Sequence, residues 1–360
     1  MEFCVARIRV LTLDGGGLRG VYTAAFLKGL ADQFSSRRHV GRLDIGKAFD
    51  LIVGTSTGSI VACAAAIDLP MQRVVDLYCE HGKDIFPQKL AKGYGALAQI
   101  PSRPRYLKEG SKALRDALEK VLGEKTIGEV YAERGIALAV PTVEMSQQRA
   151  WVFKTSHLGG HRDDNVTLVD ACMASSAAPI YLSLAAVPAT DGLGGHRVFA
   201  DGGLWANNPV LVGLIDALKM GHDEVEVFAA GTFPRPDGEL IGTDQLDRGL
   251  VGWKFGGSAA SLSIAAQEFA FDHMARMLAG EFTRLGRNVE VVRFPSGQLQ
   301  PALIPYLDLD DGSSEASTAL INQARADVNV AISACDDANS AVGRLIRDLF
   351  NDMPTTHKAE

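Results

Sequence analysis

Closely spaced cysteines are missing from this 360-residue sequence. The five that occur are odd in number and lie far apart, with no C-x-x-C pair, at Cys4, Cys63, Cys79, Cys172 and Cys335. Disulfide frameworks and zinc sites require paired or neighbouring cysteines. We therefore expect reduced, mostly buried thiols and no metal site.

An excess of positive charge is missing too. The sequence has 36 Lys and Arg residues against 43 Asp and Glu residues, which gives a net charge of −7. The molecule as a whole will not be drawn to nucleic acid or anionic lipid, so any such contact requires a local basic patch. We expect no DNA or RNA partner.

Long apolar segments and a targeting signal are also lacking. Residues 51–67 carry no charge, but they are slightly too few for a membrane span and have Gly-Thr-Ser-Thr-Gly-Ser at their centre. The N-terminus shows no basic region followed by an apolar run. We expect a cytoplasmic protein.

The chain does contain an alternation of short apolar runs and helical patterns. Strands are predicted at 8–13, 49–53, 137–140, 151–154, 198–200 and 225–230, and helices at 21–34, 59–67, 112–122 and 209–220. This alternation predicts an α/β fold with helices on both faces of a parallel or mixed sheet. Residues 35–47 are predicted to be a polar loop. Residues 233–353 are predicted to form a mainly helical region packed on this core, with one strand at 289–294, and 354–360 a disordered tail.

One G-x-S-x-G motif lies between a buried strand and a buried helix, which is the setting of a nucleophile elbow. In such a turn, small residues must flank the serine, here in the run Gly54, Thr55, Ser56, Thr57 and Gly58. The turn presents the serine hydroxyl at the sheet edge, and the following helix N-terminus favours a developing oxyanion. Ser56 is therefore the candidate nucleophile.

A glycine-rich loop follows the first strand, and its sequence is Asp-Gly-Gly-Gly-Leu-Arg-Gly at 14–20. The loop matches the G-x-G-x-x-G motif of dinucleotide-binding folds. Those folds, however, have an acidic residue about 20 positions after the motif, where this sequence offers only Asp44 in a basic loop. A P-loop is excluded because no Gly-Lys-Ser/Thr follows. Beside a nucleophile elbow, exposed backbone N–H groups favour an oxyanion hole.

An acidic turn, Asp201-Gly202-Gly203, follows the strand at 198–200. An acid at a strand end, with two glycines that clear space around it, can approach a serine directly. Taken alone, the motif is more typical of an ordinary turn without chemistry. The motif indicates a catalytic acid only in combination with the glycine-rich loop and the nucleophile elbow that precede it.

Together, the three motifs and their order resemble the patatin-like phospholipases over residues 8–212, with core strands continuing to about 232. Ala-Ser-Ser-Ala-Ala-Pro at 174–179 and Asn-Asn-Pro at 207–209 also match the family. The resemblance implies a three-layer α/β/α sandwich and a Ser56–Asp201 catalytic dyad without histidine. It places the oxyanion hole in the loop formed by Gly15, Gly16, Gly17, Leu18, Arg19 and Gly20.

This resemblance implies a chemistry that needs no metal or cofactor. Asp201 would take the proton of Ser56 during attack on a phospholipid ester, and water would hydrolyse the acyl-serine. A triad would instead need a histidine after Asp201, and His222 and His273 are available. Neither has a motif around it, so the dyad is favoured.

The segment 86–108 is the most one-sided part of the sequence in charge. It contains aromatic residues and five cations but no acid, the cations being Lys89, Lys92, Arg103, Arg105 and Lys108. Two interpretations remain open: a solvated loop, or a lid that meets anionic phospholipid headgroups, with each cation contributing about 1 kcal/mol.

The whole chain is also similar to the patatin-like effectors of bacterial cyclic-oligonucleotide antiphage systems (CBASS). That similarity implies a cyclic dinucleotide activator and action at the inner membrane, and a homo-oligomer is left open. Arg248, Trp253 and Lys254 are candidate ligand residues, although a core Trp253 with solvated cations is also compatible. An unregulated esterase or lysophospholipase and a catalytically silent binding module are the alternatives.

Overall fold

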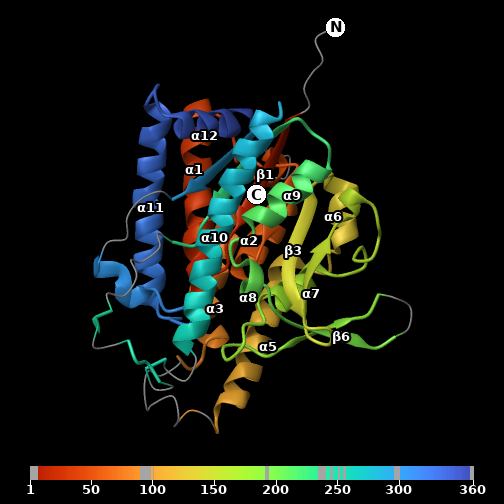
Figure 1. Cartoon of the computed structure of the whole chain (residues 1–360), viewed down its shortest axis with the longest axis vertical. Helices are drawn as coiled ribbons and strands as arrows, with labels where there is room; N and C mark the ends of the chain where they lie inside the picture. The colour runs from red at the N-terminus through yellow and green to blue at the C-terminus, as the bar shows by residue number, and fades with distance from the viewer. Residues whose placement is uncertain are drawn as a thin grey trace.

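The computed structural model (Figure 1) describes residues 7–89, 99, 101–190, 194–233, 241–243, 246–249, 252, 253, 257–295 and 301–356. Its centre is an eight-stranded mixed sheet with the order β5-β6-β3-β2-β1-β7-β8, and β4 also pairs with β3. The strands are β1 (Arg7–Leu13), β2 (Leu51–Gly54), β3 (Ala137–Glu144), β4 (Arg149–Lys154), β5 (Ala185–Pro188), β6 (His196–Asp201), β7 (Glu224–Ala230) and β8 (Asn288–Phe294). The pairs from β3 through β2, β1 and β7 to β8 are parallel, whereas β4, β5 and β6 pair in antiparallel fashion.

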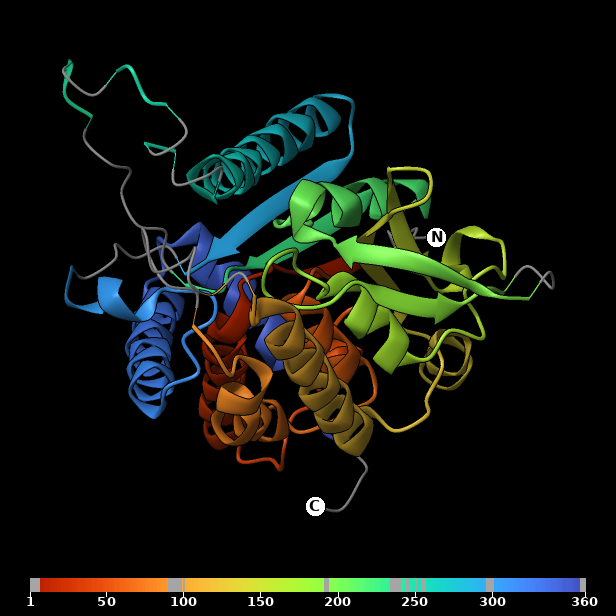
Figure 2. The same ribbon diagram turned by 90° about the horizontal axis from the view of Figure 1, so that it is seen from below.

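Helices cover both faces of this sheet, as Figure 2 shows from below. The described helices are α1 (Gly20–Arg38), α2 (Thr57–Ala66), α3 (Met71–Ile85), α5 (Arg103–Leu122), α6 (Ile127–Arg134), α7 (Leu168–Ser175), α8 (Gly203–Ala206), α9 (Val210–Lys219), α10 (Gly257–Arg284), α11 (Ser314–Asp336) and α12 (Ala341–Asp352). The predicted three-layer α/β/α sandwich is confirmed.

Alternation along β1 explains the two apolar layers. Leu11 and Leu13 pack into one core with helices α1, α2, α3, α11 and α12, whereas Ile8 and Val10 pack into the other with α9 and α10. Successive side chains of a strand point to opposite faces, and β1 is apolar on both because both faces are covered.

The C-terminal region packs on the same core as the rest of the chain. Its strand β8 pairs with β7 along the full length of both strands. On the other face, the Tyr22 hydroxyl of α1 donates to Asp327 of α11 at 2.6 Å. The elements after residue 233 therefore extend both the sheet and the helical layers.

Two predictions of irregular structure are wrong in part. The region 35–47 is not all loop, because α1 continues to Arg38 and ends at His39, which has φ 53°. The tail is not disordered from Pro354, because Pro354 and Thr356 form backbone hydrogen bonds with Asp44 and Arg42. Residues 357–360 lie outside the described residues. Among the helices that are described, none is both long enough and apolar enough to cross a membrane.

Candidate active site

Ser56 lies in a sharp turn between β2 and α2, with φ 52° and ψ −125°. This is a strained conformation for a residue with a Cβ, and such strain is typical of functional sites. A Cβ at Gly54 would overlap the carbonyl of Gly58, and a Cβ at Gly58 would overlap that of Leu13. The two glycines of the motif are therefore required by the close approach of backbone to backbone.

The hydroxyl of Ser56 meets the carboxylate of Asp201 at the end of β6. Ser56 Oγ donates to Asp201 Oδ2 at 2.7 Å, and Gly203 N–H donates to Asp201 Oδ1 at 2.6 Å. Both side chains are buried. A Cβ at Gly202 would overlap the carbonyl of Pro141, so the glycines after Asp201 do clear space for the turn.

Burial raises the pKa of Asp201 to about 6, against the lowering effect of the hydrogen bonds from Ser56 and Gly203. A buried carboxylate without a cationic partner favours its neutral form, which makes the ionised form a stronger base. At neutral pH, Asp201 is then largely ionised but more basic than an ordinary aspartate. Such a pKa near the working pH suits a general base.

The histidines do not take part in this arrangement. Within the described part of the chain, neither His222 nor His273 forms a hydrogen bond with Ser56 or Asp201. The buried His157 contacts Thr155 and Asp216 instead. The geometry therefore offers a serine–aspartate pair, not a triad.

Not all six residues predicted for the oxyanion hole have a backbone N–H group that is free to bind an oxyanion. Gly15 N–H donates to the Asn207 carbonyl at 2.8 Å, Leu18 N–H to the Leu309 carbonyl at 3.0 Å and Arg19 N–H to the Gly16 carbonyl at 3.2 Å. Gly20 N–H bonds within the 3-10 turn Gly17–Arg19. In the described residues, Gly16 and Gly17 are left without an acceptor for their N–H groups. Of the six predicted residues, Gly16 and Gly17 are therefore the two whose N–H groups are available to an oxyanion.

Packing explains why this loop must be glycine. A Cβ at Gly16 would overlap the Thr232 side chain, and one at Gly17, where φ is +57°, would overlap the Leu309 carbonyl. At Gly15, an added Cβ would lie 3.3 Å from that of Ser56. The loop is therefore held close to the serine by its neighbours.

Thr57 is a further donor that sequence reasoning assigned only to the turn. Its N–H begins α2 and has no acceptor among the described residues. Its hydroxyl bonds to the Gly17 carbonyl and lies 2.6 Å from the Tyr78 hydroxyl, so it ties the glycine loop to the elbow. The signal was available, because the residue after an elbow nucleophile commonly contributes to the oxyanion hole.

Ser175 is a second missed residue. Its hydroxyl accepts from Ser56 N–H at 2.8 Å and donates to the Pro141 carbonyl at 2.6 Å. It lies at the end of α7, within the family-like segment 174–179, but nothing in the sequence indicated its contact. It holds the backbone of the nucleophile in place.

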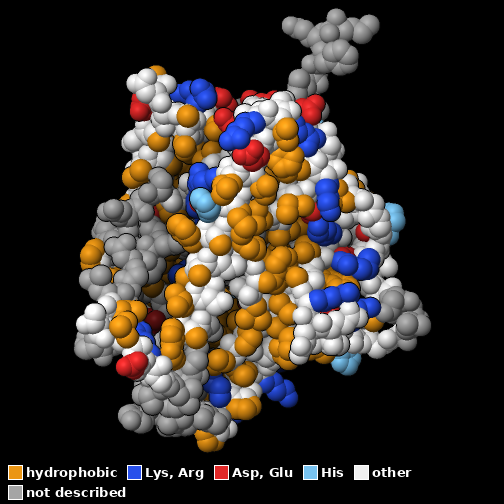
Figure 3. Space-filling model, viewed as in Figure 1, with side chains coloured by type: hydrophobic (Ala, Val, Ile, Leu, Met, Phe, Trp, Pro, Cys, Tyr) orange, Lys and Arg blue, Asp and Glu red, His pale blue; other side chains and the backbone are white. Residues whose placement is uncertain are grey.

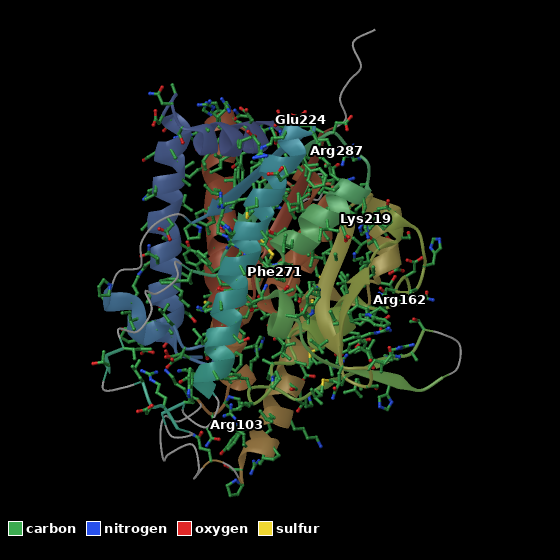
Figure 4. All side chains as sticks on the ribbon, in the orientation of Figure 1. Arg103, Arg162, Lys219, Glu224, Phe271 and Arg287 are labelled. Carbon is green, nitrogen blue, oxygen red and sulfur yellow. The ribbon has the colours of Figure 1, made fainter. Side chains whose placement is uncertain are left out.

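Arg293 of β8 connects the C-terminal region to the start of the glycine loop. It contacts Asp14 at 2.7 Å and Asp272 of α10 at 2.9 Å, and the Arg293 and Asp14 side chains are 14% and 5% exposed. A buried, doubly paired guanidinium fixes the groups that it joins. Figure 4 shows α10 crossing in front of the sheet, with Phe271 at its middle.

Acids outside the predicted basic segment pair with two of its cations. Lys89 pairs with Asp308 and Asp311 at 3.0 and 2.7 Å, and Arg105 pairs with Glu109 at 2.7 Å. Arg103, Arg105 and Lys108 lie in the first turns of α5 and not in a loop, whereas Lys92 lies outside the described residues. The premise of an unpaired basic patch is therefore wrong for Lys89 and Arg105.

The three predicted ligand residues are only partly described. Trp253 N–H donates to the Gly249 carbonyl at 3.0 Å, and Arg248 and Trp253 are each partly exposed. Lys254 lies outside the described residues. Among the described residues, no group of three or more His, Cys, Asp or Glu side chains could hold a metal ion.

Comparison with known proteins supports the motif assignment. Residues 11–214 match the family model described as patatin-like phospholipase. A cGAMP-activated phospholipase of Pseudomonas aeruginosa is 35% identical over 75% of each chain. The corresponding Vibrio cholerae protein is 30% identical over 71% of this chain and 68% of its own. An Escherichia coli one is 33% identical over 63% and 62%, respectively.

The motifs, the sandwich fold and the family match agree with one another. The hydrolase class that the sequence predicted, one acting on carboxylic esters, is that of this family. The chain belongs to the patatin-like phospholipase family.

Proposed function

We propose that this protein hydrolyses fatty-acyl esters of membrane phospholipids, with Ser56 as nucleophile and Asp201 as general base. The observation that carries the proposal is the 2.7 Å hydrogen bond from Ser56 Oγ to the buried Asp201 carboxylate. It occurs in a strained elbow beside amide groups at Gly16, Gly17 and Thr57 that have no acceptor in the described structure.

The chemistry follows from these groups. As Ser56 Oγ attacks the ester carbonyl, its proton passes to Asp201 Oδ2, and the oxyanion forms against the free amides. Asp201 returns the proton to the leaving oxygen, which releases the lysolipid and leaves an acyl-Ser56. Water, deprotonated by Asp201, then hydrolyses this ester. Each oxyanion donor is worth about 2.7–4 kcal/mol.

Exposed apolar side chains on α8 and α10 support a lipid substrate. Leu204 directly follows Gly203, and Phe269 directly follows Glu268, which hydrogen-bonds Asn207; their exposed fractions are 47% and 70%. Figure 3 shows hydrophobic side chains spread over this face, where α8, α9 and α10 lie. A patch of this kind is suited to a membrane surface.

The names of the relatives support a regulated enzyme. Proteins 30–35% identical to this chain are named cGAMP-activated phospholipases, and one 31% identical is named a cUMP-AMP-activated phospholipase. We extend the proposal to an antiphage effector of the CBASS type, cytoplasmic and peripheral at the inner membrane. Arg248, Trp253 and Lys254 are the sequence-based ligand candidates, and homo-oligomers are compatible with this role. An unregulated esterase or lysophospholipase is the alternative.

Hydrolysis of a fluorogenic phospholipid, measured with and without cGAMP and cUMP-AMP, tests both the proposed phospholipase activity and the proposed activation. We expect low basal hydrolysis and at least tenfold activation by one ligand, which requires about 1.4 kcal/mol of differential affinity for the active state. Full activity without ligand would leave an unregulated lipase. No hydrolysis in any condition would favour the silent binding module.

A further inference from the structure

A hollow of about 250 Å³ lies between β4, β5 and β6, away from the catalytic serine. Its walls combine aromatic rings with arginine, and the main contributors are Trp151, Phe153, Phe199, Arg162 and Arg197. Neither the sequence motifs nor the proposed chemistry uses these residues. Figure 3 shows Lys and Arg side chains gathered on this side of the molecule, where Figure 4 labels Arg162.

Three guanidinium groups surround the ring of Trp151. The Cζ atoms of Arg149, Arg162 and Arg197 lie 5.2, 4.0 and 5.1 Å from its centroid, within the range of cation–π contact. Like charges gathered around one ring repel each other unless an anion lies between them. The ring therefore holds together a cluster that an anion would stabilise.

Two carboxylates partly balance this cluster. Asp163 accepts both Nε and Nη2 of Arg162, at 2.7 and 2.6 Å, and the Lys154 N–H at 2.9 Å, so its oxygens are already engaged. Glu144 is electrostatically coupled to Arg197 but accepts the Ser146 and Gln147 N–H groups. Arg149 forms no salt bridge with any described residue. Arg149 is therefore the cation of this cluster whose charge no described acid balances.

The wall also contains an unmet hydrogen-bond donor. The indole Nε1 of Trp151 is buried and donates to no acceptor in the described structure. A buried donor without a partner carries an energetic cost that a bound oxygen removes. Cations, a free donor and aromatic surface together are the chemistry that recognises a phosphorylated nucleotide.

We propose that this Trp151 hollow, not the segment around Arg248, binds a phosphodiester group of the cyclic dinucleotide activator. The inference rests on the regulation proposed above. The hollow is smaller than sites that enclose a drug-sized ligand, which span about 300–1,000 Å³, so it would hold one phosphate and its sugar, with the rest of the ligand at the surface.

The hollow has a short covalent connection to the catalytic base. Arg197, Phe199 and Asp201 alternate along β6, so their side chains lie on the same face of the strand. Phe199 lies 5.9 Å from Trp151, centroid to centroid, and two residues before Asp201. A ligand that shifts Arg197 or Phe199 would therefore act on the strand that positions Asp201.

Calorimetric titration of the full chain tests this site without any measurement of hydrolysis. The probes are cGAMP and cUMP-AMP, with AMP, inorganic phosphate and the acyl-free lipid headgroup glycerophosphoglycerol as comparisons. We expect one cyclic dinucleotide to bind at least tenfold more tightly than these comparisons. The Arg149→Gln/Arg197→Gln variant should weaken that binding at least tenfold, whereas Arg149→Lys/Arg197→Lys, which keeps the charges, should retain a measurable part of it.

Arg287→Gln is the matched control, because Arg287 also lies over an aromatic ring, that of Phe282 at 5.9 Å. Arg287 is distant from the hollow in sequence, and Figure 4 labels it near the top of the view, well above Arg162. It should change the affinity less than twofold. Thermal melts confirm that each variant is folded. Four results would overturn the proposal. The Arg149→Gln/Arg197→Gln variant binds as tightly as the wild type, or Arg248→Gln alone abolishes binding. Alternatively, glycerophosphoglycerol binds most tightly, or the wild type binds neither cyclic dinucleotide. Because binding is read directly, an inactive enzyme that still binds would count against the proposed hydrolysis and not against this site.

Discussion

At the residue scale, the proposed hydrolysis depends on one buried carboxylate. Asp201 has a hydroxyl and an amide as partners but no cation, and burial raises its pKa to about 6. The sequence identified Asp201 because a glycine pair follows it in the family order. It could not identify Ser175, because a contact between turns that are distant in the sequence leaves no periodic pattern.

The first prediction concerns the pH dependence of hydrolysis. Because Asp201 must be ionised to accept the Ser56 proton, kcat/KM on a short soluble ester should rise about tenfold per pH unit below pH 6 and level off above it. Rate measurements from pH 4.5 to 8 check this, with circular dichroism to confirm the fold at each pH. A rate that rises only above pH 7 would point to another base.

The same pKa predicts a stability effect at neutral pH. The folded-state pKa lies above the unfolded value near 3.9, so the protonated form stabilises the fold below that value and this contribution is lost as pH rises through about 6. Asp201→Asn removes the buried charge at pH 7.5. Its free energy of unfolding should rise by at most about 3 kcal/mol, while hydrolysis is lost. Denaturant melts at pH 4 and 7.5 check this, because the gain should disappear at the lower pH.

At the element scale, β8 joins the C-terminal part of the chain to the glycine-rich loop. The sequence predicted β8 as a strand at 289–294, but not that it continues the sheet, because pairing partners are set by topology and not by composition. The same limit applies to the short strand β5, whose four residues carry too little pattern to predict.

Arg293 allows this connection to be tested. Arg293→Gln leaves Asp14 buried without its cation, which should cost about 3–5 kcal/mol of stability and lower kcat by disordering the glycine loop. Asp14→Asn/Arg293→Gln removes both charges and should recover more than half of the lost stability. Denaturant melts of the single and double variants measure this. Equal losses in both would show that the pair does not act as a unit.

At the scale of the whole molecule, the exposed apolar face is the surface that we expect to meet the membrane. One of the two sequence-based interpretations gave that role to the cations of 86–108, but Lys89 and Arg105 have acidic partners in the folded chain. Asp311 is 222 residues from Lys89, so that pairing cannot be predicted from charge counts within a segment. The Arg105–Glu109 pair is instead a local i,i+4 contact with the first residue beyond the segment.

Leu204→Ser/Phe269→Ser should therefore lower hydrolysis of lipid vesicles at least fivefold while changing that of a short soluble ester less than twofold. The control is Leu285→Ser, because Leu285 is 78% exposed but lies just beyond the C-terminal end of α10. Sedimentation with vesicles measures binding separately. A larger loss from Lys89→Gln/Arg105→Gln than from the apolar pair would restore the basic segment as the membrane contact.

The proposed catalytic dyad of Ser56 and Asp201 is tested by phospholipid hydrolysis, measured with matched variants under activating conditions. Ser56→Ala and Asp201→Asn should each lower kcat by at least about a thousandfold while remaining folded. His222→Ala/His273→Ala should stay within twofold of the wild type. A histidine variant that loses as much activity as Asp201→Asn, or an Asp201→Asn enzyme that stays active, would contradict the dyad.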